Sequence, residues 1–303
     1  MKMEFKDLEI FQKVAEKGTI TEAAKELNYV QSNVTSRIQK LESELNTPLF
    51  NRHRRGMTLT PEGKKLLTYS RKILRLTEEM KLAVQSKDEP SGKLELGTVE
   101  TVIRLPKILS AYVKKYKHVD LTIITGVTEE LKQKVLNHEL DGAFVSESYY
   151  HPDLEYYEVF EEELVLISDP RKTSIEELIG EPFLCFRKGC KYRARLEKWY
   201  NDRKIKPKKI MEFGTLETIL ESVSTGLGIS FVPKSAVRQM ERNGSIKTFT
   251  LPDKYCKIKT VFIRRTDTRL TSTIEKFIET IEQSKQTSGD KQEKFNHIVS
   301  NAT

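Results

Sequence analysis

The fold is decided by residues 19–42, which read TITEAAKELNYVQSNVTSRIQKLE. Thr19 and Glu22 have the spacing of a capping box, which predicts the start of a helix, and Asn28 tolerates the left-handed backbone that would end it. A second helix is predicted from an apolar stripe with spacings of three and four residues, at Val34, Ile38, Leu41 and Leu45. Residues 4–17 can supply a further helix to cover these two. The pattern predicts a helix-turn-helix.

The polar face of the second predicted helix suits contact with DNA base edges. Its side chains are short, they end in hydrogen-bonding groups, and no carboxylate occurs from residue 27 to residue 41. The alternative is an ordinary helical hairpin with a solvated face, but such faces are usually rich in Glu and Lys. We therefore predict that this helix enters a major groove by its N-terminus. The predicted contacts are Gln31, Ser32, Asn33, Thr35, Ser36 and Arg37.

The composition indicates a soluble protein of several domains. The chain has 303 residues, of which 37% are hydrophobic and 32% charged, enough for two or three cores. No window approaches the roughly 18 apolar residues that span a bilayer, and residues 1–7 lack the apolar core of a signal peptide. We expect a cytoplasmic protein without membrane contact. Three cysteines and five scattered histidines lack metal or disulfide spacing, so no metal or cofactor is expected.

Positive charge is concentrated beside the predicted reading helix. The whole chain has a net charge of +8, and residues 31–75 contain ten Lys or Arg against three Glu. Residues 49–50 and 57–59 can pair as short strands around a basic loop, which would form a wing. Its arginines, Arg52, Arg54 and Arg55, would enter a minor groove or neutralise phosphates. The alternative is a basic hairpin that contacts only solvent.

A long helix is predicted after the wing. Residues 60–63 read TPEG, which supplies an N-cap, a proline at the first helical position and an early carboxylate. The helical pattern continues to residues 88–92, and a helix about 40 Å long at ~1.5 Å per residue cannot bury its apolar face alone. We interpret it as a dimerisation helix that presents two DNA-reading heads to a symmetric site. The alternative is that it packs on its own domain.

From residue 93 the pattern alternates between strands and helices, which predicts an α/β fold with a mostly parallel sheet. Strands are predicted at 94–99, 121–125, 142–145, 164–168, 183–186, 210–213, 229–232 and 260–263. Helices are predicted at 103–117, 128–137, 175–179, 192–203, 216–225, 235–243 and 270–284. Residues 285–303 are polar and are predicted to form a disordered tail.

The order of these elements resembles the LysR-type transcriptional regulators. The N-terminal motifs that support the resemblance lie at residues 8–11, 14–19, 23–24, 31–35, 48–52 and 59–63. The C-terminal half contributes Gly97, Leu105-Pro106 and residues 140–143 and 226–233. Together these motifs extend from residue 4 to about residue 283.

The resemblance implies a winged helix-turn-helix at 1–60, a linker and dimerisation helix at 61–90, and an effector-binding domain of periplasmic-binding-protein type at 91–284. Lobe I of that α/β domain would comprise 91–161 and 266–284, and lobe II would comprise 162–265. The resemblance further implies a homodimer through the linker helix, a homotetramer, double-stranded promoter DNA as partner, and a small-molecule effector in the cleft that controls activation or repression.

Two positions differ from the family's usual pattern. Val30 stands where a capping serine is common, which would weaken the helix start by about 1 kcal/mol. Ser36 stands where an arginine is often found, so a bidentate grip on guanine is missing. Gln31, which can grip adenine, is the best candidate for reading a base, and Arg37 is expected to bind phosphate.

The predicted effector contacts follow the strands at 94–99, 121–125 and 183–186. In open α/β folds ligands lie at the carboxyl ends of strands, near helix N-termini that favour anions. A small carboxylate or another oxyanion would suit the hydroxyls, backbone amides and guanidinium there. The predicted residues are Thr98, Glu100, Thr101, Thr128, Gly189 and Arg193. Glu100 disfavours a highly charged anion or holds an amine, and the threonines could instead only cap helices.

Three further interpretations stay open. Cys190 is flanked by Lys188, Lys191 and Arg193, conditions that lower a thiol pKa, so a redox switch is one of them. The chain could also be a ligand-binding module whose basic arm serves an acidic partner other than DNA. An α/β enzyme is the third, although no Ser-His-Asp order or paired acid motif is evident and we expect no catalysis.

Overall fold

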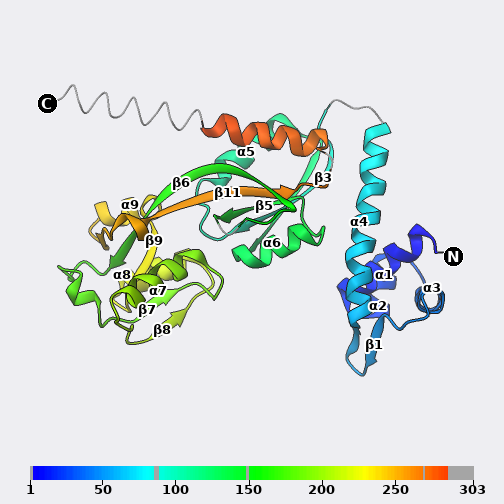
Figure 1. The fold of residues 1–303 in the computed structure, drawn as a ribbon, viewed down its shortest axis with the longest axis horizontal. Coiled ribbons are helices and arrows are strands. Elements are labelled where there is room, and N and C mark those ends of the chain that lie inside the picture. Colours follow the sequence, from blue (N-terminus) through cyan, green and yellow to red (C-terminus); the bar gives the residue numbers. More distant parts are fainter. Residues whose placement is uncertain (1–2, 85–88, 148–149, 269, 286–303) are drawn as a thin grey trace. The chain divides into compact units, whose positions relative to one another are not determined.

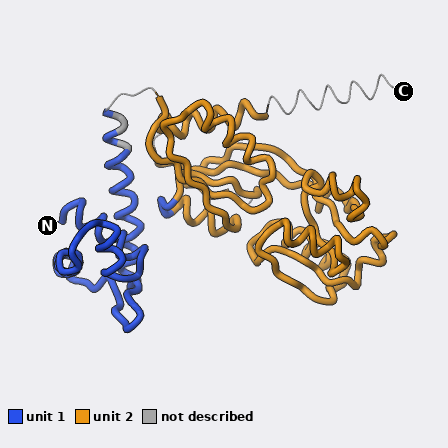
Figure 2. Tube along the Cα trace, turned by 180° about the vertical axis from the view of Figure 1, so that it is seen from behind, with its two compact units in different colours: residues 1–87, 137–139 blue, residues 88–136, 140–303 orange. Residues whose placement is uncertain are grey.

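The computed structural model describes residues 3–84, 89–147, 150–268 and 270–285. It divides into two compact units, residues 1–87 with 137–139 and residues 88–136 with 140–303 (Figure 2). Each unit has an apolar core of its own. Within the described residues, no helix combines the length and the apolar character that a membrane span requires.

Three helices form the core of the first unit: α1 (Phe5–Lys17), α2 (Ile20–Glu26) and α3 (Gln31–Glu44). The local signals act as predicted. Thr19 Oγ1 accepts a hydrogen bond of 3.2 Å from the Glu22 amide, and Asn28 has a φ of 56° just beyond α2. The apolar stripes of the helices meet in a core that includes Phe11, Val34 and Ile38, which confirms the helix-turn-helix.

An antiparallel hairpin follows α3. It consists of β1 (Phe50–His53) and β2 (Gly56–Leu59), joined by a turn at Arg54 and Arg55. Gly56 has a φ of 131°, and a Cβ at this position would lie 2.4 Å from the Gly18 carbonyl oxygen. The Met57 amide donates to the same oxygen at 2.7 Å, so a side chain at residue 56 would push the hairpin off the α1–α2 turn.

Helix α4 (Pro61–Val84) starts as predicted, because Thr60 Oγ1 accepts a hydrogen bond of 2.9 Å from the Gly63 amide. Its first turns pack on the helical core, where Ser70 is fully buried. Farther along, Leu76, Met80 and Val84 are exposed. The first half of α4 therefore packs on its own domain, which was the alternative to dimerisation. The second half leaves its apolar side chains exposed. Residues 85–88, which the prediction includes in this helix, lie outside the described residues.

One lobe of the second unit is built on three parallel strands, β3 (Gly92–Val99), β4 (Val119–Gly126) and β5 (Gly142–Ser146). Helices α5 (Leu105–Lys115) and α6 (Thr128–Leu136) and the helix at 272–285 complete it (Figure 1). Its core contains an aromatic cluster whose neighbouring ring centroids lie 5.0–6.0 Å apart, formed by Tyr112, Phe144, Phe262 and Phe277.

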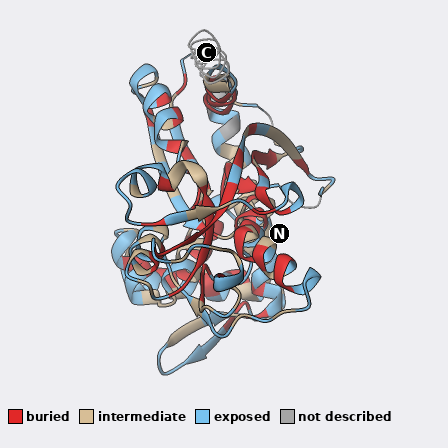
Figure 3. Ribbon diagram, turned by 90° about the vertical axis from the view of Figure 1, so that its left-hand side faces the viewer, coloured by how far each residue is buried: buried red, intermediate tan, exposed pale blue. Residues whose placement is uncertain are grey.

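The other lobe contains β7 (Phe183–Cys185), β8 (Ile210–Glu212), β9 (Ser230–Pro233) and β10 (Lys247–Phe249). Its helices are η1 (Glu176–Leu178), α7 (Lys191–Asp202), α8 (Leu216–Ser224), α9 (Lys234–Arg242) and α10 (Asp253–Cys256). Its central strand is the second part of β6 (Leu154–Ser168), whose alternate residues enter two separate apolar clusters. Both faces of the sheet are therefore covered. Figure 3 shows buried residues following the strands and exposed residues on the outer helix faces.

Two long strands, β6 (Leu154–Ser168) and β11 (Lys257–Arg265), run antiparallel through both lobes. The first lobe's core includes residues 261–263 of β11, which pair with β5. The predicted boundary between residues 265 and 266 is therefore wrong: within β11 the chain re-enters the first lobe at about residue 261. A continuous strand shows no break in its alternating pattern, so the sequence does not mark this crossing.

Other elements also differ from the prediction. The first part of β6 was not predicted, because glutamates and tyrosines at 155–163 interrupt the apolar pattern, and β10 and α10 were not predicted either. The sheets are less parallel than predicted, since β6 pairs antiparallel with β9, β10 and β11. Lys285 ends the last helix instead of starting the predicted tail, and residues 286–303 lie outside the described residues.

Candidate functional site

The start of α3 presents polar side chains to solvent. Gln31, Ser32, Asn33 and Ser36 are exposed, as a base-reading face requires. Thr35 is half-buried, and its hydroxyl donates to the Gln31 carbonyl at 2.9 Å, so its proton is engaged within the helix. Four of the predicted contacts are thus available for base edges, and Thr35 is available only as an acceptor.

No side chain caps the first turn of α3. Its N-cap residue, Val30, has an extended backbone and is 68% exposed, but makes no capping hydrogen bond. The Asn33 amide donates to the Val30 carbonyl at 3.1 Å, so the amides of Gln31 and Ser32 are the ones at the start of α3 that can bind an external acceptor such as a phosphate oxygen. Val30, which weakens the start of the helix because it cannot cap it, therefore also leaves backbone amides available to bind an anion.

Arg37 lies against the start of α1. Its Nη1 is 2.7 Å from Asp7 Oδ1 and 3.1 Å from Glu4 Oε2, and Asp7 is only 2% exposed. These two carboxylates raise the pKa of the Arg37 guanidinium, with the hydrogen bond to Asp7 as the largest cause. The Arg37 guanidinium thus already binds two carboxylates of the protein, and a phosphate would have to compete with them for the predicted contact. Asp7 was missed, since nothing in the pattern of α1 marks it as a partner for a residue 30 positions away.

A second missed residue, Glu42, joins α3 to the hairpin. Its Oε1 accepts hydrogen bonds from the Leu49 amide at 2.8 Å and the Phe50 amide at 3.2 Å. Its other oxygen lies 3.8 Å from Arg52, which therefore has a partner inside the protein. Arg54 and Arg55 at the turn are exposed, so the two outermost predicted wing residues are free to meet DNA.

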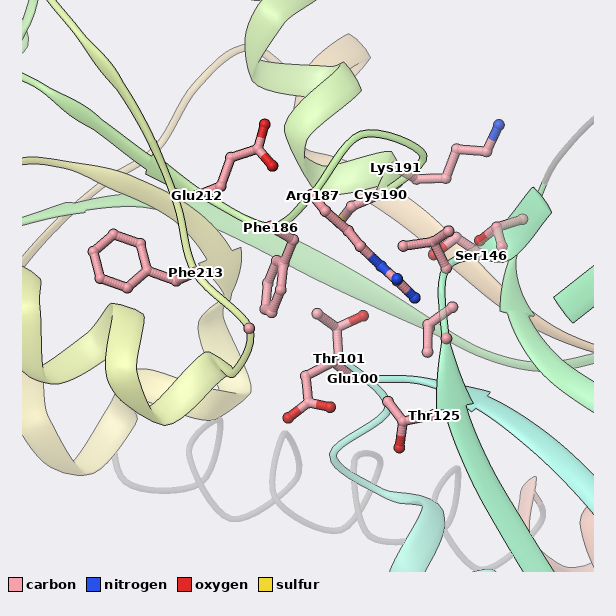
Figure 4. Close-up of a pocket in the computed structure, with 15 residues that line it drawn as sticks. Glu100, Thr101, Thr125, Ser146, Phe186, Arg187, Cys190, Lys191, Glu212 and Phe213 are labelled. Carbon is pink, nitrogen blue, oxygen red and sulfur yellow. The ribbon is translucent and has the colours of Figure 1, made fainter. Parts of the chain in front are cut away.

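A cavity of about 490 Å³ lies between the two lobes of the second unit (Figure 4). The first lobe contributes the ends of β3, β4 and β5 and the start of α6. The other lobe contributes the segment between β7 and α7 and the end of β8. Of the predicted effector contacts, three line the cavity: Glu100, Thr101 and Thr128.

Thr128 is the first residue of α6 and is 1% exposed, yet its Oγ1 has no hydrogen-bond partner within the described part of the chain. A buried hydroxyl without a partner costs free energy. Beside it are the first amides of α6, which no turn of the helix can satisfy. A ligand atom that accepts or donates hydrogen bonds in the cavity would meet both.

Three predicted effector contacts do not line the cavity: Thr98, Gly189 and Arg193. The Thr98 hydroxyl donates to the Val99 carbonyl at 3.1 Å. Arg193 is 6% exposed and binds the carboxylates of Glu197 and Glu212, each at 2.7 Å. Burial lowers the pKa of Arg193, but these two hydrogen bonds outweigh that effect and raise it. Arg193 therefore lies outside the cavity lining with its charge paired to two carboxylates, and its predicted contact with the ligand stays a prediction.

Two other cations line the cavity and were not predicted as contacts. Arg187 Nη2 lies 2.7 Å from Glu130 Oε2, and Lys191 Nζ lies 3.6 Å from Glu129 Oε1. Both ion pairs connect the lobes, and all four side chains keep contact with solvent. Ion pairs of this kind contribute about 0–1 kcal/mol, so a bound ligand can compete with them.

Cys190 lines the cavity as the N-cap residue of α7. Burial raises the pKa of its thiol, and the nearby backbone amides and Arg193 do not compensate. The basic neighbours in the sequence therefore do not produce the low pKa that a redox switch would require.

Comparisons with known proteins agree with this organisation. A family model described as "Bacterial regulatory helix-turn-helix protein, lysR family" matches residues 5–64, and one described as "LysR substrate binding domain" matches residues 87–286. The HTH-type transcriptional regulator SoxR of Arthrobacter sp. is 58% identical over 285 residues, which is 94% of this chain and 99% of that protein. The HTH-type transcriptional regulator CzcR of Bacillus cereus is 52% identical over 281 residues, 93% of this chain and 98% of that protein.

One solved structure with a similar fold is full-length CbnR complexed with its target DNA. It matches with a TM-score of 0.65 at 22% identity and covers 93% of this chain and 100% of that one.

The ion pair beneath α3 gives a first testable prediction. Asp7→Asn removes the charge but keeps the shape of the side chain, and it should reduce the free energy of local opening of α1–α3 by about 1.5–3 kcal/mol. Hydrogen exchange of the amides at 5–44 in the full-length protein measures this. Glu9→Gln is the matched control, because Glu9 lies on the same helix, is half-buried where Asp7 is fully buried, and is paired with Lys6 of that helix. Equal losses in the two variants would contradict the role given to Asp7.

Proposed function

Because the chain belongs to the LysR family of DNA-binding transcriptional regulators, we propose that it recognises a specific promoter sequence as an oligomer and responds to a small anionic effector. The family places a DNA-binding domain before a substrate-binding domain, and its members are regulators and not enzymes. The α/β enzyme alternative is thereby removed. We further propose that the protein acts in the cytoplasm, where its promoter DNA is.

The observation that supports sequence-specific reading is the exposed, carboxylate-free start of α3. Amide and hydroxyl side chains there can pair with base edges, and the uncapped backbone amides can fix the helix on a phosphate. Arg54 and Arg55 at the hairpin turn add two exposed positive charges within the same unit. One unit thus combines groups that can specify bases with groups that can bind any phosphate.

The far half of α4 supports a homodimer. Leu76, Met80 and Val84 recur every four residues and are all exposed in a single chain. Residues at this spacing form one line along a helix, and such a line is stabilised by packing against a second helix. We assign this line to the α4 of a second copy. Further contacts between dimers would complete the expected homotetramer.

The cavity between the lobes supports an anionic group in the effector. The start of α6 provides a partial positive charge, and the Thr128 hydroxyl beside it is unpartnered among the described residues. Arg187 and Lys191 lie on the opposite wall, within reach of a shared ligand. A carboxylate placed there would satisfy the hydroxyl and the helix amides together.

Specific reading by Gln31 can be tested by gel shift with the promoter beside the protein's own gene and a scrambled duplex of equal length. Gln31→Ala should weaken binding to the promoter by about 1–3 kcal/mol and leave the scrambled duplex unaffected, because only the bidentate contact to a base is lost. An equal loss on both duplexes would show that Gln31 does not read a base. No preference by the unmodified protein would refute sequence-specific recognition.

The hairpin of β1 and β2, with Arg54 and Arg55 at its turn, is expected to bind DNA without regard to sequence. Changing Arg54 and Arg55 together to Ala should weaken binding to both duplexes, because phosphate contacts are independent of sequence. The slope of log affinity against log salt should become shallower by about two, roughly 0.9 for each lost contact. Lys114→Ala together with Lys115→Ala, two changes on α5 of the other unit, is the control for the loss of net charge. An unchanged slope in the wing variant would remove the wing from the interface.

The α4 assignment is tested by the oligomeric state. Leu76→Glu together with Met80→Glu places carboxylates on the exposed line, and burying them unpaired against a partner would be costly. The variant should sediment as a monomer at concentrations where the unmodified protein is an oligomer. Tyr69→Glu, another exposed apolar position on α4, tests whether the effect is confined to the line. A variant that stays dimeric would contradict the assignment.

A further inference from the structure

We propose that the effector of this cavity is a zwitterion, with its anionic group at the start of α6 and an ammonium group at Glu100. The proposal rests on the proposed function, because it assigns a ligand class to the same cavity. A zwitterion differs from an effector that carries only negative charge. The reason for preferring it is which charged side chains around the cavity have an ion-pair partner and which do not.

The charged groups that line the cavity are Glu100, Arg187, Lys191 and Glu212. Arg187 is paired with Glu130 and Lys191 with Glu129. Glu212 is paired with Arg193 at 2.7 Å. Among the described residues, no cation is paired with Glu100. Among the described residues that line this cavity, the charge without a partner is therefore the carboxylate of Glu100. A purely anionic ligand would have to approach this negative charge.

Glu100 also lines a second cavity, of about 350 Å³, so it stands where the two meet. The walls of this second cavity are apolar and are formed by Ile103, Leu216, Leu220, Ala236 and Met240. Glu217 and Glu221 line it as well, and neither carboxylate has an ion-pair partner within the described ranges. The three carboxylates are exposed, so each attracts a cation only as strongly as a partly solvated site allows, and the apolar side chains beside them suit an apolar stem.

The other end favours an anion. Helix α6 has nine residues, and its first residue, Thr128, lines the cavity, so the positive end of the helix lies at the cavity wall. The independent sign of a ligand is Thr128, whose hydroxyl is buried at the wall and has no partner in the described structure. In Figure 4 the Glu100 carboxylate points away from the Arg187 guanidinium, so the negative and positive parts of the wall are separate.

A zwitterion meets both ends without net repulsion. Its carboxylate would bind the α6 amides and Thr128, and its ammonium would neutralise Glu100. A simple carboxylate of the same length would gain only the first contact and leave Glu100 uncompensated. A dicarboxylate would bring like charges together. The cavity therefore selects for opposite charges at the two ends of one small molecule.

The test uses ligand pairs that differ only in the amine: γ-aminobutyrate with butyrate, and δ-aminovalerate with valerate. Binding to the full-length protein is measured by calorimetric titration and by the shift of the thermal unfolding midpoint. At least one amino acid should bind about five- to tenfold more tightly than its parent carboxylate, the effect of one favourable charge pair at a partly solvated site. Glu100→Gln should abolish this preference, because it should weaken the binding of the amino acid and leave the binding of the parent carboxylate unchanged.

Glu95→Gln is the matched control, because Glu95 is exposed on β3, the strand that ends just before Glu100, it lies outside the cavity, and the change removes the same charge. It should keep the preference. The proposal is overturned if the plain carboxylates bind as well as the amino acids, if no amino acid binds, or if Glu100→Gln retains the preference. Promoter binding is measured separately by gel shift. A protein that prefers its promoter but not the amino acids would disprove only the ligand class, whereas loss of promoter preference would disprove the proposed function.

Discussion

Two strands shared by both lobes are the constraint on which the cavity depends. Because β6 and β11 each run through the two lobes, the lobes are joined by one antiparallel ribbon and cannot close into a single core. The space left between them is lined by the ends of shorter strands, where backbone groups and helix starts are available to a ligand. The ion pairs that cross this space among the described residues include those of Arg187 and Lys191, which are solvent-exposed and weak. A small molecule bound between the lobes would therefore compete with weak ion pairs when it changes how the lobes are arranged.

Charge compensation inside the protein separates the groups that can bind ligands from those that cannot. Arg37 and Arg193 look like binding residues in the sequence, but each is held by two carboxylates of the same chain. By contrast, Thr128 and Glu100 line the cavity, and within the described residues Thr128 Oγ1 has no hydrogen-bond partner and Glu100 has no ion-pair partner. A functional assignment therefore depends on which charges remain after the internal pairs are counted.

Local signals made the helix-turn-helix, the hairpin and the start of α4 predictable. Capping residues, the left-handed Asn28 and the apolar stripes act over a few positions, so one sequence contains all the information. Partners distant in sequence were not predictable by this route: Asp7 is 30 residues from Arg37, and Glu212 is 19 residues from Arg193. The crossing within β11 was also hidden, because a strand keeps its alternation when its neighbours change. Of the predicted cleft residues, those that follow a strand end closely, Glu100, Thr101 and Thr128, line the cavity, and their contact with an effector stays a prediction.

The hydrogen bonds of Glu42 have a consequence for the shape of the bound DNA. One carboxylate at the end of α3 holds the two amides where the hairpin begins, so the helix and the hairpin form a single rigid piece. If α3 enters one groove and Arg54 and Arg55 reach another, as proposed, the separation between the two contacts is set by the protein. Any mismatch with straight B-form geometry has to be absorbed by the duplex. Flexible base steps between the two contact points would thus be favoured even though no side chain touches them.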